Sequence, residues 1–281
     1  MSIALLRLAT VLYAGAALAY VAYFARQRHA RLATAGYWLL AVGFVFQAVS
    51  IGLGCKQYGG TEFFSLRGGF FTIAWMAAGA YLLLQRAYHI PAVGAFVTPL
   101  LLLAVVPALF GEPGRPGIPP ETLSNKSLTV HILTAALGDV LFGLAFAVAT
   151  MYLLQEREVK GKHFGALFSR LPSLDALDRL CQRLVRAGFV SYTIAILAGT
   201  MIASVVWKSA WSWDPRQVVS LAVWLLYGAI VQLRHTGWHG RRYALLAVVG
   251  FVVVIGSMVS LQVIPGATRH TGTYQGSEVR Q

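Results

Sequence analysis

Long runs of apolar residues dominate the chain and are separated by short polar segments. An α-helix needs about 20 residues to cross the ~30 Å hydrocarbon core of a bilayer. Seven runs are long enough and an eighth is slightly short, so the pattern predicts about eight transmembrane helices. The predicted spans lie near residues 3–25, 36–54, 68–88, 93–110, 128–154, 187–206, 217–233 and 243–263. We therefore expect an all-α integral membrane protein.

Composition supports this fold class. The chain has 281 residues, of which 57% are hydrophobic and 12% charged, and this is too apolar for a soluble domain of the same length. No internal repeat or low-complexity tract interrupts the pattern. We expect a single polytopic membrane domain over residues 1–281, with the lipid bilayer as its surroundings.

The net charge of +13 does not indicate nucleic-acid binding, because the basic residues sit in short loops and form no continuous soluble face. They indicate orientation instead. The loops at 26–35, 86–92, 155–186 and 234–242 would share one side, and they contain most of the 23 lysines and arginines. By the positive-inside rule this side is cytoplasmic, so both termini are expected to be extracytoplasmic.

The segment LPSLDALDRLCQRLVRAG, before the sixth span, has a helical pattern of its own. Ser173 is a suitable N-cap, acidic residues precede the arginines, and leucines recur at helical spacing. The pattern predicts an amphipathic helix lying on the inner membrane face. A solvated connector helix is the alternative.

The outer loop between spans 6 and 7 is rich in tryptophan. Trp207, Trp211 and Trp213 fall within seven residues, between Lys208 and Arg216, and an Asp-Pro turn ends the loop. Tryptophans are common at membrane surfaces, so an aromatic belt is one interpretation. A platform for a planar ligand is the other.

The placement of the histidines favours the interpretation of the loop as a platform for a planar ligand. Under the predicted topology only His131 and His270 lie on the outer side, and the cytoplasmic histidines are His29, His89, His163, His235 and His239. Two neutral imidazoles can ligate one heme iron, indole rings can pack on the porphyrin, and basic side chains can neutralise its propionates. We therefore predict an outer site for heme b, with Lys208 or Arg216 near a propionate.

The run AWSWDPRQVVSLAVWLLYGAIVQLR resembles the tryptophan-rich signature of the WWD heme-handling superfamily. LPSLDALDRLCQRLVRAGF and GWHGRR, the latter followed by a span and a histidine-bearing tail, are similar to the CcsA-type members in particular. The resemblance covers about residues 125–271 well and the first four spans loosely.

This resemblance implies an eight-span protein of a bacterial-type cytoplasmic (inner) membrane. It would act with a CcsB-like membrane protein as the heme-handling subunit of a cytochrome c synthase, delivering heme to the extracytoplasmic face for attachment to apocytochrome c. It also implies that His131 and His270 ligate the heme and that the signature is formed by Trp207, Trp211, Trp213 and Asp214.

Three positions depart from the family pattern. Gln232 and Gln47 stand where relatives have histidines in spans 7 and 2, and Gln217 stands where a glutamate usually closes the signature. An inner heme site is therefore in doubt. The alternative function is a noncatalytic membrane scaffold or regulator that keeps the fold.

Asp139 and the two cysteines are the remaining residues with possible chemical roles. Asp139 lies eight residues beyond His131, about 12 Å deeper in the same span, and is either a pathway residue or a structural acid. Cys55 and Cys181 fall on opposite sides of the membrane and cannot pair. Since the sequence has no Cys-x-x-Cys motif, it carries no thiol relay of its own.

Overall fold

The computed structural model describes residues 3–26, 29–58, 66–110, 126–162, 168, 171–206, 208–211 and 213–263. These ranges contain helices and connecting turns and no strand. The helices are α1 (Ile3–Ala25), α2 (Ala30–Tyr58), α3 (Leu66–Tyr88), the short 3-10 helix η2 (Pro91–Val93), α4 (Gly94–Phe110), α6 (Lys126–Lys160), α8 (Leu174–Val206), α9 (Pro215–His235) and α10 (Arg241–Val263). The all-α prediction is confirmed for this part of the chain.

Seven of the described helices are long and apolar enough to cross a membrane. They correspond to the first seven predicted spans, and the chain is a multi-pass membrane protein. The eighth predicted span coincides with α10, which has 23 residues. The exact number of crossings and the side that each terminus faces stay predictions.

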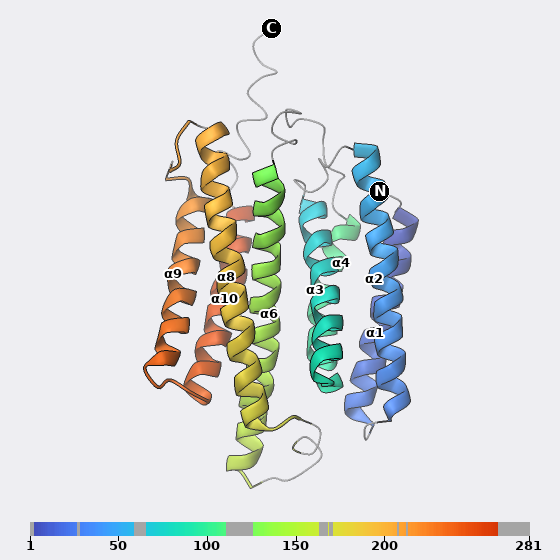
Figure 1. Ribbon diagram of the computed structural model, residues 1–281. Helices are drawn as coiled ribbons and strands as arrows, with labels where there is room; N and C mark the ends of the chain where they lie inside the picture. The colour runs from blue at the N-terminus through green and yellow to red at the C-terminus, as the bar shows by residue number, and fades with distance from the viewer. Residues whose placement is uncertain are drawn as a thin grey trace.

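The helices form two groups (Figure 1). In the first, α1 packs against α2 and α4, and α4 packs against α3. In the second, α6 packs against α8 and α10, and α9 packs against α8 and α10. Contacts between α3 and α6 join the groups. We call the end where α3 and α6 begin and α8 ends the His131 end; it is the upper end in Figure 1.

A buried polar network joins α1, α2 and α3. The Tyr13 hydroxyl on α1 donates to Oε1 of Gln47 on α2, and Nε2 of Gln47 donates to the Phe71 carbonyl on α3 at 2.9 Å. Gln47 is completely buried. Because both ends of its amide have partners, this polar residue is accommodated without a buried unsatisfied group.

The two longest helices pair along their length. α6 has 35 residues and α8 has 33, so each is about 50 Å long and exceeds the ~30 Å hydrocarbon core. Three side-chain-to-backbone hydrogen bonds cross between them: Cys181 Sγ to the Ala145 carbonyl at 3.7 Å, Ser191 Oγ to the Thr134 carbonyl at 2.8 Å, and His131 Nδ1 to the Ala195 carbonyl at 2.7 Å.

The segment before the sixth span does not form a separate surface helix. Ser173 caps it as predicted, since Ala176 N–H donates to Ser173 Oγ at 3.3 Å. The helix then continues without a break through Val206 as α8. No proline interrupts its backbone hydrogen bonds, and Leu177 and Leu180 are buried within the protein core. The prediction of a helix lying along the membrane face is therefore wrong.

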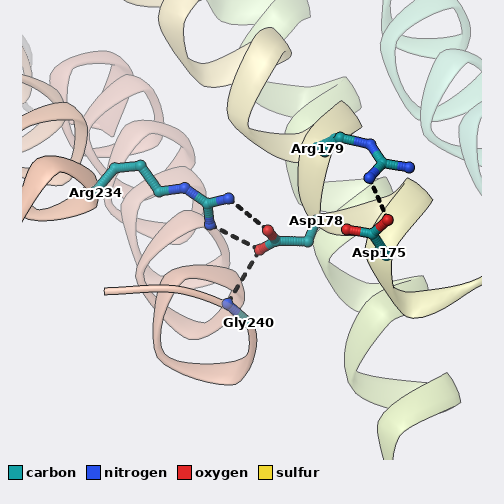
Figure 2. A network of polar contacts seen from close by, with 5 residues as sticks. All are labelled: Asp175, Asp178, Arg179, Arg234 and Gly240. Atoms are coloured by element: carbon teal, nitrogen blue, oxygen red, sulfur yellow. Dashed lines mark hydrogen bonds and ion pairs between the residues drawn. The ribbon is translucent and has the colours of Figure 1, made fainter. Parts of the chain in front are cut away.

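An ion pair ties three helices together at the end opposite His131 (Figure 2). Arg234 of α9 donates to both carboxylate oxygens of Asp178 on α8, at 2.9 and 2.5 Å. Gly240 N–H, just before α10, donates to the same carboxylate at 3.1 Å. Gly240 has a φ of +61°, which glycine adopts readily. The pair therefore fixes the α9–α10 turn against α8.

Candidate functional site

His131 lies in the second turn of α6, half-buried against α8. Its Nδ1 is 2.7 Å from the Ala195 carbonyl oxygen. A carbonyl oxygen can only accept, so Nδ1 carries the proton in this hydrogen bond. In the neutral ring, Nε2 then keeps its lone pair. This is the arrangement found in metal-ligating histidines, where the second ring nitrogen donates to a carbonyl or carboxylate.

Gly199 makes the close approach of this ring possible. It lies one turn after Ala195, and a Cβ at this position would be 2.9 Å from His131 Nδ1 and 3.0 Å from Cε1. Real Cβ atoms rarely come so close to a neighbouring group, and the ring would have to move. One turn deeper, the Ser191–Thr134 hydrogen bond fixes the register of the two helices. The imidazole of His131 on α6 is thus held by its hydrogen bond to Ala195 and its packing against Gly199, both on α8.

The tryptophan loop lies between the end of α8 and the start of α9, also at the His131 end (Figure 1). The rings of Trp211 and Trp213 meet edge to face, with centroids 5.5 Å apart. Ser209 Oγ donates to the Trp211 carbonyl at 2.6 Å. Trp213 is 77% exposed, so its indole is not part of the core. An aromatic pair with one exposed ring can receive a planar apolar ligand.

Backbone strain accompanies this loop. Lys208 and Trp213 both have a φ of +54°, a left-handed conformation that costs a non-glycine residue roughly 1 kcal/mol or more. Such strain is concentrated at functional sites, where the surrounding structure holds it in place. Lys208 is exposed and Arg216 is half-buried.

Asp214 has a structural role that the sequence analysis did not assign. It is the N-cap of α9, and its carboxylate accepts the Arg216 N–H at 2.9 Å. Asp214 is only 3% exposed, and Pro215 occupies the first helical position. Capping by Asp followed by Pro is a strong helix start. Asp214 therefore sets where the loop ends and α9 begins; a contact between it and heme stays a prediction.

Two predicted site residues, Trp207 and His270, lie outside the described residues. His131 and the described part of the loop share one end of the bundle, whereas the pairing of His131 with His270 stays a prediction. Within the described ranges, no group of three or more His, Cys, Asp or Glu side chains gathers as a metal site.

Sequence reasoning missed Ala195 and Gly199. The Ala195 group is a backbone carbonyl, which has no signal in the sequence, and Gly199 was indistinguishable from other glycines in the apolar spans. Asp139 lies eight residues deeper than His131 on α6 and is half-buried.

The fold is that of a polytopic α-helical membrane protein. The chain also belongs to a family, because the model of the cytochrome c assembly protein family matches residues 64–264. Its relatives make the assignment more specific, as a CcsA-type cytochrome c biogenesis protein.

Three of these relatives are named cytochrome c biogenesis protein CcsA. The protein of Synechococcus sp. (strain CC9902) is 31% identical over 207 residues, which cover 65% of this chain and 68% of the relative. That of Prochlorococcus marinus (strain NATL2A) is 29% identical over 221 residues, covering 68% and 70%. That of Parasynechococcus marenigrum (strain WH8102) is 29% identical over 231 residues, covering 73% and 75%.

Proposed function

We propose that this chain holds heme b at the extracytoplasmic face of a cytoplasmic membrane and presents it to apocytochrome c, together with a CcsB-like partner. The family supports a role in cytochrome c biogenesis. The observation that carries the heme assignment is the 2.7 Å contact between His131 Nδ1 and the Ala195 carbonyl, which leaves Nε2 as the lone-pair donor.

The residues at this end fit a heme. His131 would supply one axial nitrogen and His270 the other, so a cluster of three ligating side chains is not required. Trp207, Trp211 and Trp213 would pack against the porphyrin, and Lys208 or Arg216 would neutralise a propionate. When bound, the heme supplies the vinyl groups that become thioether links; the chain's own residues bind and orient it.

Gln47 weakens the case for a second heme ligated from α2. Gln47 stands where the family resemblance implies a histidine in span 2, and its Oε1 and Nε2 are engaged by Tyr13 and Phe71. An amide oxygen is a poorer ligand for heme iron than an imidazole nitrogen, and moving Gln47 toward a metal would strain these two buried hydrogen bonds. The proposal therefore rests on the site that contains His131.

The CcsB-like partner is part of the proposal because attachment needs reduced cysteines on the apocytochrome. The sequence contains no Cys-x-x-Cys motif, and Cys181 is buried against the Ala145 carbonyl on α6. This chain alone then offers no dithiol to reduce or position the acceptor.

Absorption spectra of the protein purified in mild detergent, first oxidised and then reduced with dithionite, test the proposal. The wild type should carry heme b with a bis-histidine spectrum. His131→Ala should lose most of it, and added imidazole should restore part by filling the vacated position. His235→Ala is the matched control, because His235 is at the other end of the bundle.

Two outcomes would contradict the proposal. A wild-type protein without heme, and without affinity for added heme, would favour the noncatalytic scaffold. A protein that keeps its heme in His131→Ala but loses it in His235→Ala would place the site at the opposite end.

A further inference from the structure

Arg67 is a buried arginine in the first turn of α3, at the His131 end. It is only 6% exposed. The positions four, seven and eleven residues further along α3 are Phe71, Ala74 and Ala78, and all three are buried in the core. Since these spacings lie on one side of a helix, Arg67 belongs to the inward-facing stripe of α3 and does not point to lipid.

The guanidinium has no partner within the described part of the chain. Its Nε is buried without a hydrogen bond, and Arg67 takes part in none of the ion pairs found there. The described acidic residues lie elsewhere: Glu156, Glu158, Asp175 and Asp178 at the opposite end, Asp139 inside the α6 span, and Asp214 at the N-cap of α9.

An arginine buried without a partner among the described residues calls for an anion. The guanidinium stays protonated in proteins, so it cannot escape the cost of burial by losing its charge. Removing a charge from water without a counter-charge costs several kcal/mol. Its planar fork of N–H groups matches a carboxylate in a bidentate pair.

The helix packed against α3 suggests which anion this is. α3 packs against α6, and both helices begin at the His131 end (Figure 1). If this end holds heme, the ligand brings two carboxylates with it. Lipid phosphates suit Arg67 less well, because its side chain is already enclosed by the protein and faces away from the surrounding lipid.

We propose that Arg67 binds a propionate of the heme as a buried specificity residue, in addition to the roles proposed for Lys208 and Arg216. This inference rests on the proposed function. It adds a contact from the first group of helices, so the heme would be held by both groups and not by the tryptophan-loop half alone.

The test compares two ligands and uses the full chain in mild detergent. Hemin has free propionates and hemin dimethyl ester does not, and the dissociation constant of each is measured by absorbance titration. The wild type should bind hemin at least about tenfold more tightly than the ester, as expected for a charge-assisted pair. Arg67→Gln should lose about tenfold in hemin affinity and change the ester's affinity by less than about twofold.

Two further variants support the measurement. Arg67→Lys keeps the charge and should retain part of the preference for hemin, even if Arg67→Gln folds poorly. Lys56→Gln is the matched control, because Lys56 is an exposed cation in the last turn of α2 at the same end. It should leave the preference unchanged.

The outcomes separate the inference from the proposed function. If the wild type binds neither ligand, the heme proposal itself fails. If it binds hemin but Arg67→Gln keeps the wild-type preference, Arg67 pairs with another anion, such as a lipid phosphate, and the inference is wrong. Equal weakening of both ligands would show a structural role and would also overturn it.

Discussion

Gly199→Ala tests the orientation of His131 without touching a ligand. The new methyl group would lie 2.9 Å from Nδ1 and 3.0 Å from Cε1, so the ring must withdraw by roughly 0.5–1 Å to reach ordinary contact. The 2.7 Å hydrogen bond to Ala195 would then lengthen beyond the usual range of about 3.2 Å.

The expected energies separate stability from binding. Losing the hydrogen bond and overpacking the contact cost roughly 2–3 kcal/mol together. Replacing a helical glycine by alanine returns about 1 kcal/mol. The fold should therefore lose only about 1–2 kcal/mol, whereas loss of the partner that orients a metal ligand typically lowers affinity by about 10- to 100-fold. We expect a folded protein with much less heme.

Heme content and hemin titrations measure this effect, with thermal unfolding as the check on folding. Gly228→Ala is the matched control, because its Cβ would sit 3.4 Å from Phe189 in ordinary contact. In a His131→Ala background, Gly199→Ala should add little, since the clash involves that ring. If Gly199→Ala binds hemin like the wild type while His131→Ala does not, the carbonyl contact does not orient the ligand and our reasoning is refuted.

Three further predictions concern the rest of the molecule. Asp178→Ala leaves Arg234 buried without its counter-charge and should destabilise the fold by about 3 kcal/mol in denaturant unfolding. Asp175→Ala breaks the neighbouring exposed pair in Figure 2 and should cost less than about 1 kcal/mol. Equal losses would contradict a special role for the buried pair. Single cysteines at Ser212 and Gly272, in a chain without its native cysteines, should react with impermeant thiol reagents from outside the cell; reaction only from the cytoplasm would reverse the topology. Co-expression with an apocytochrome c but without a CcsB-like partner should give no covalent heme on the cytochrome by heme staining of gels, and a stained product would show that this chain acts alone.

The hydrophobic pattern predicted most of the fold but not the ends of its longest helices. The spans predicted at 128–154 and 187–206 became α6 and α8, which continue to Lys160 and begin at Leu174. Hydropathy falls where charged residues begin, whereas backbone hydrogen bonding continues through residues such as Glu and Arg, which are good helix formers. Hydropathy therefore marks the part of a helix suited to lipid and not its full length.

The candidate site could be predicted only in part. Residue type and topology singled out His131 and the tryptophan loop, and both lie at one end of the bundle. The contacts to Ala195 and Asp178 could not be foreseen, because each joins residues more than 50 positions apart and depends on how two helices cross. Arg67 was overlooked because an arginine at the start of a span usually lies at the membrane surface.

The hydrogen bonds between α6 and α8 fix the register and the relative rotation of the two helices. A single residue inserted in α6 between Thr134 and Ala145 would turn everything on one side of it by 100° relative to the other. The Cys181 and His131 contacts could then no longer be satisfied together. Even far from the His131 end, α6 and α8 should therefore tolerate changes of side chain much better than changes of length.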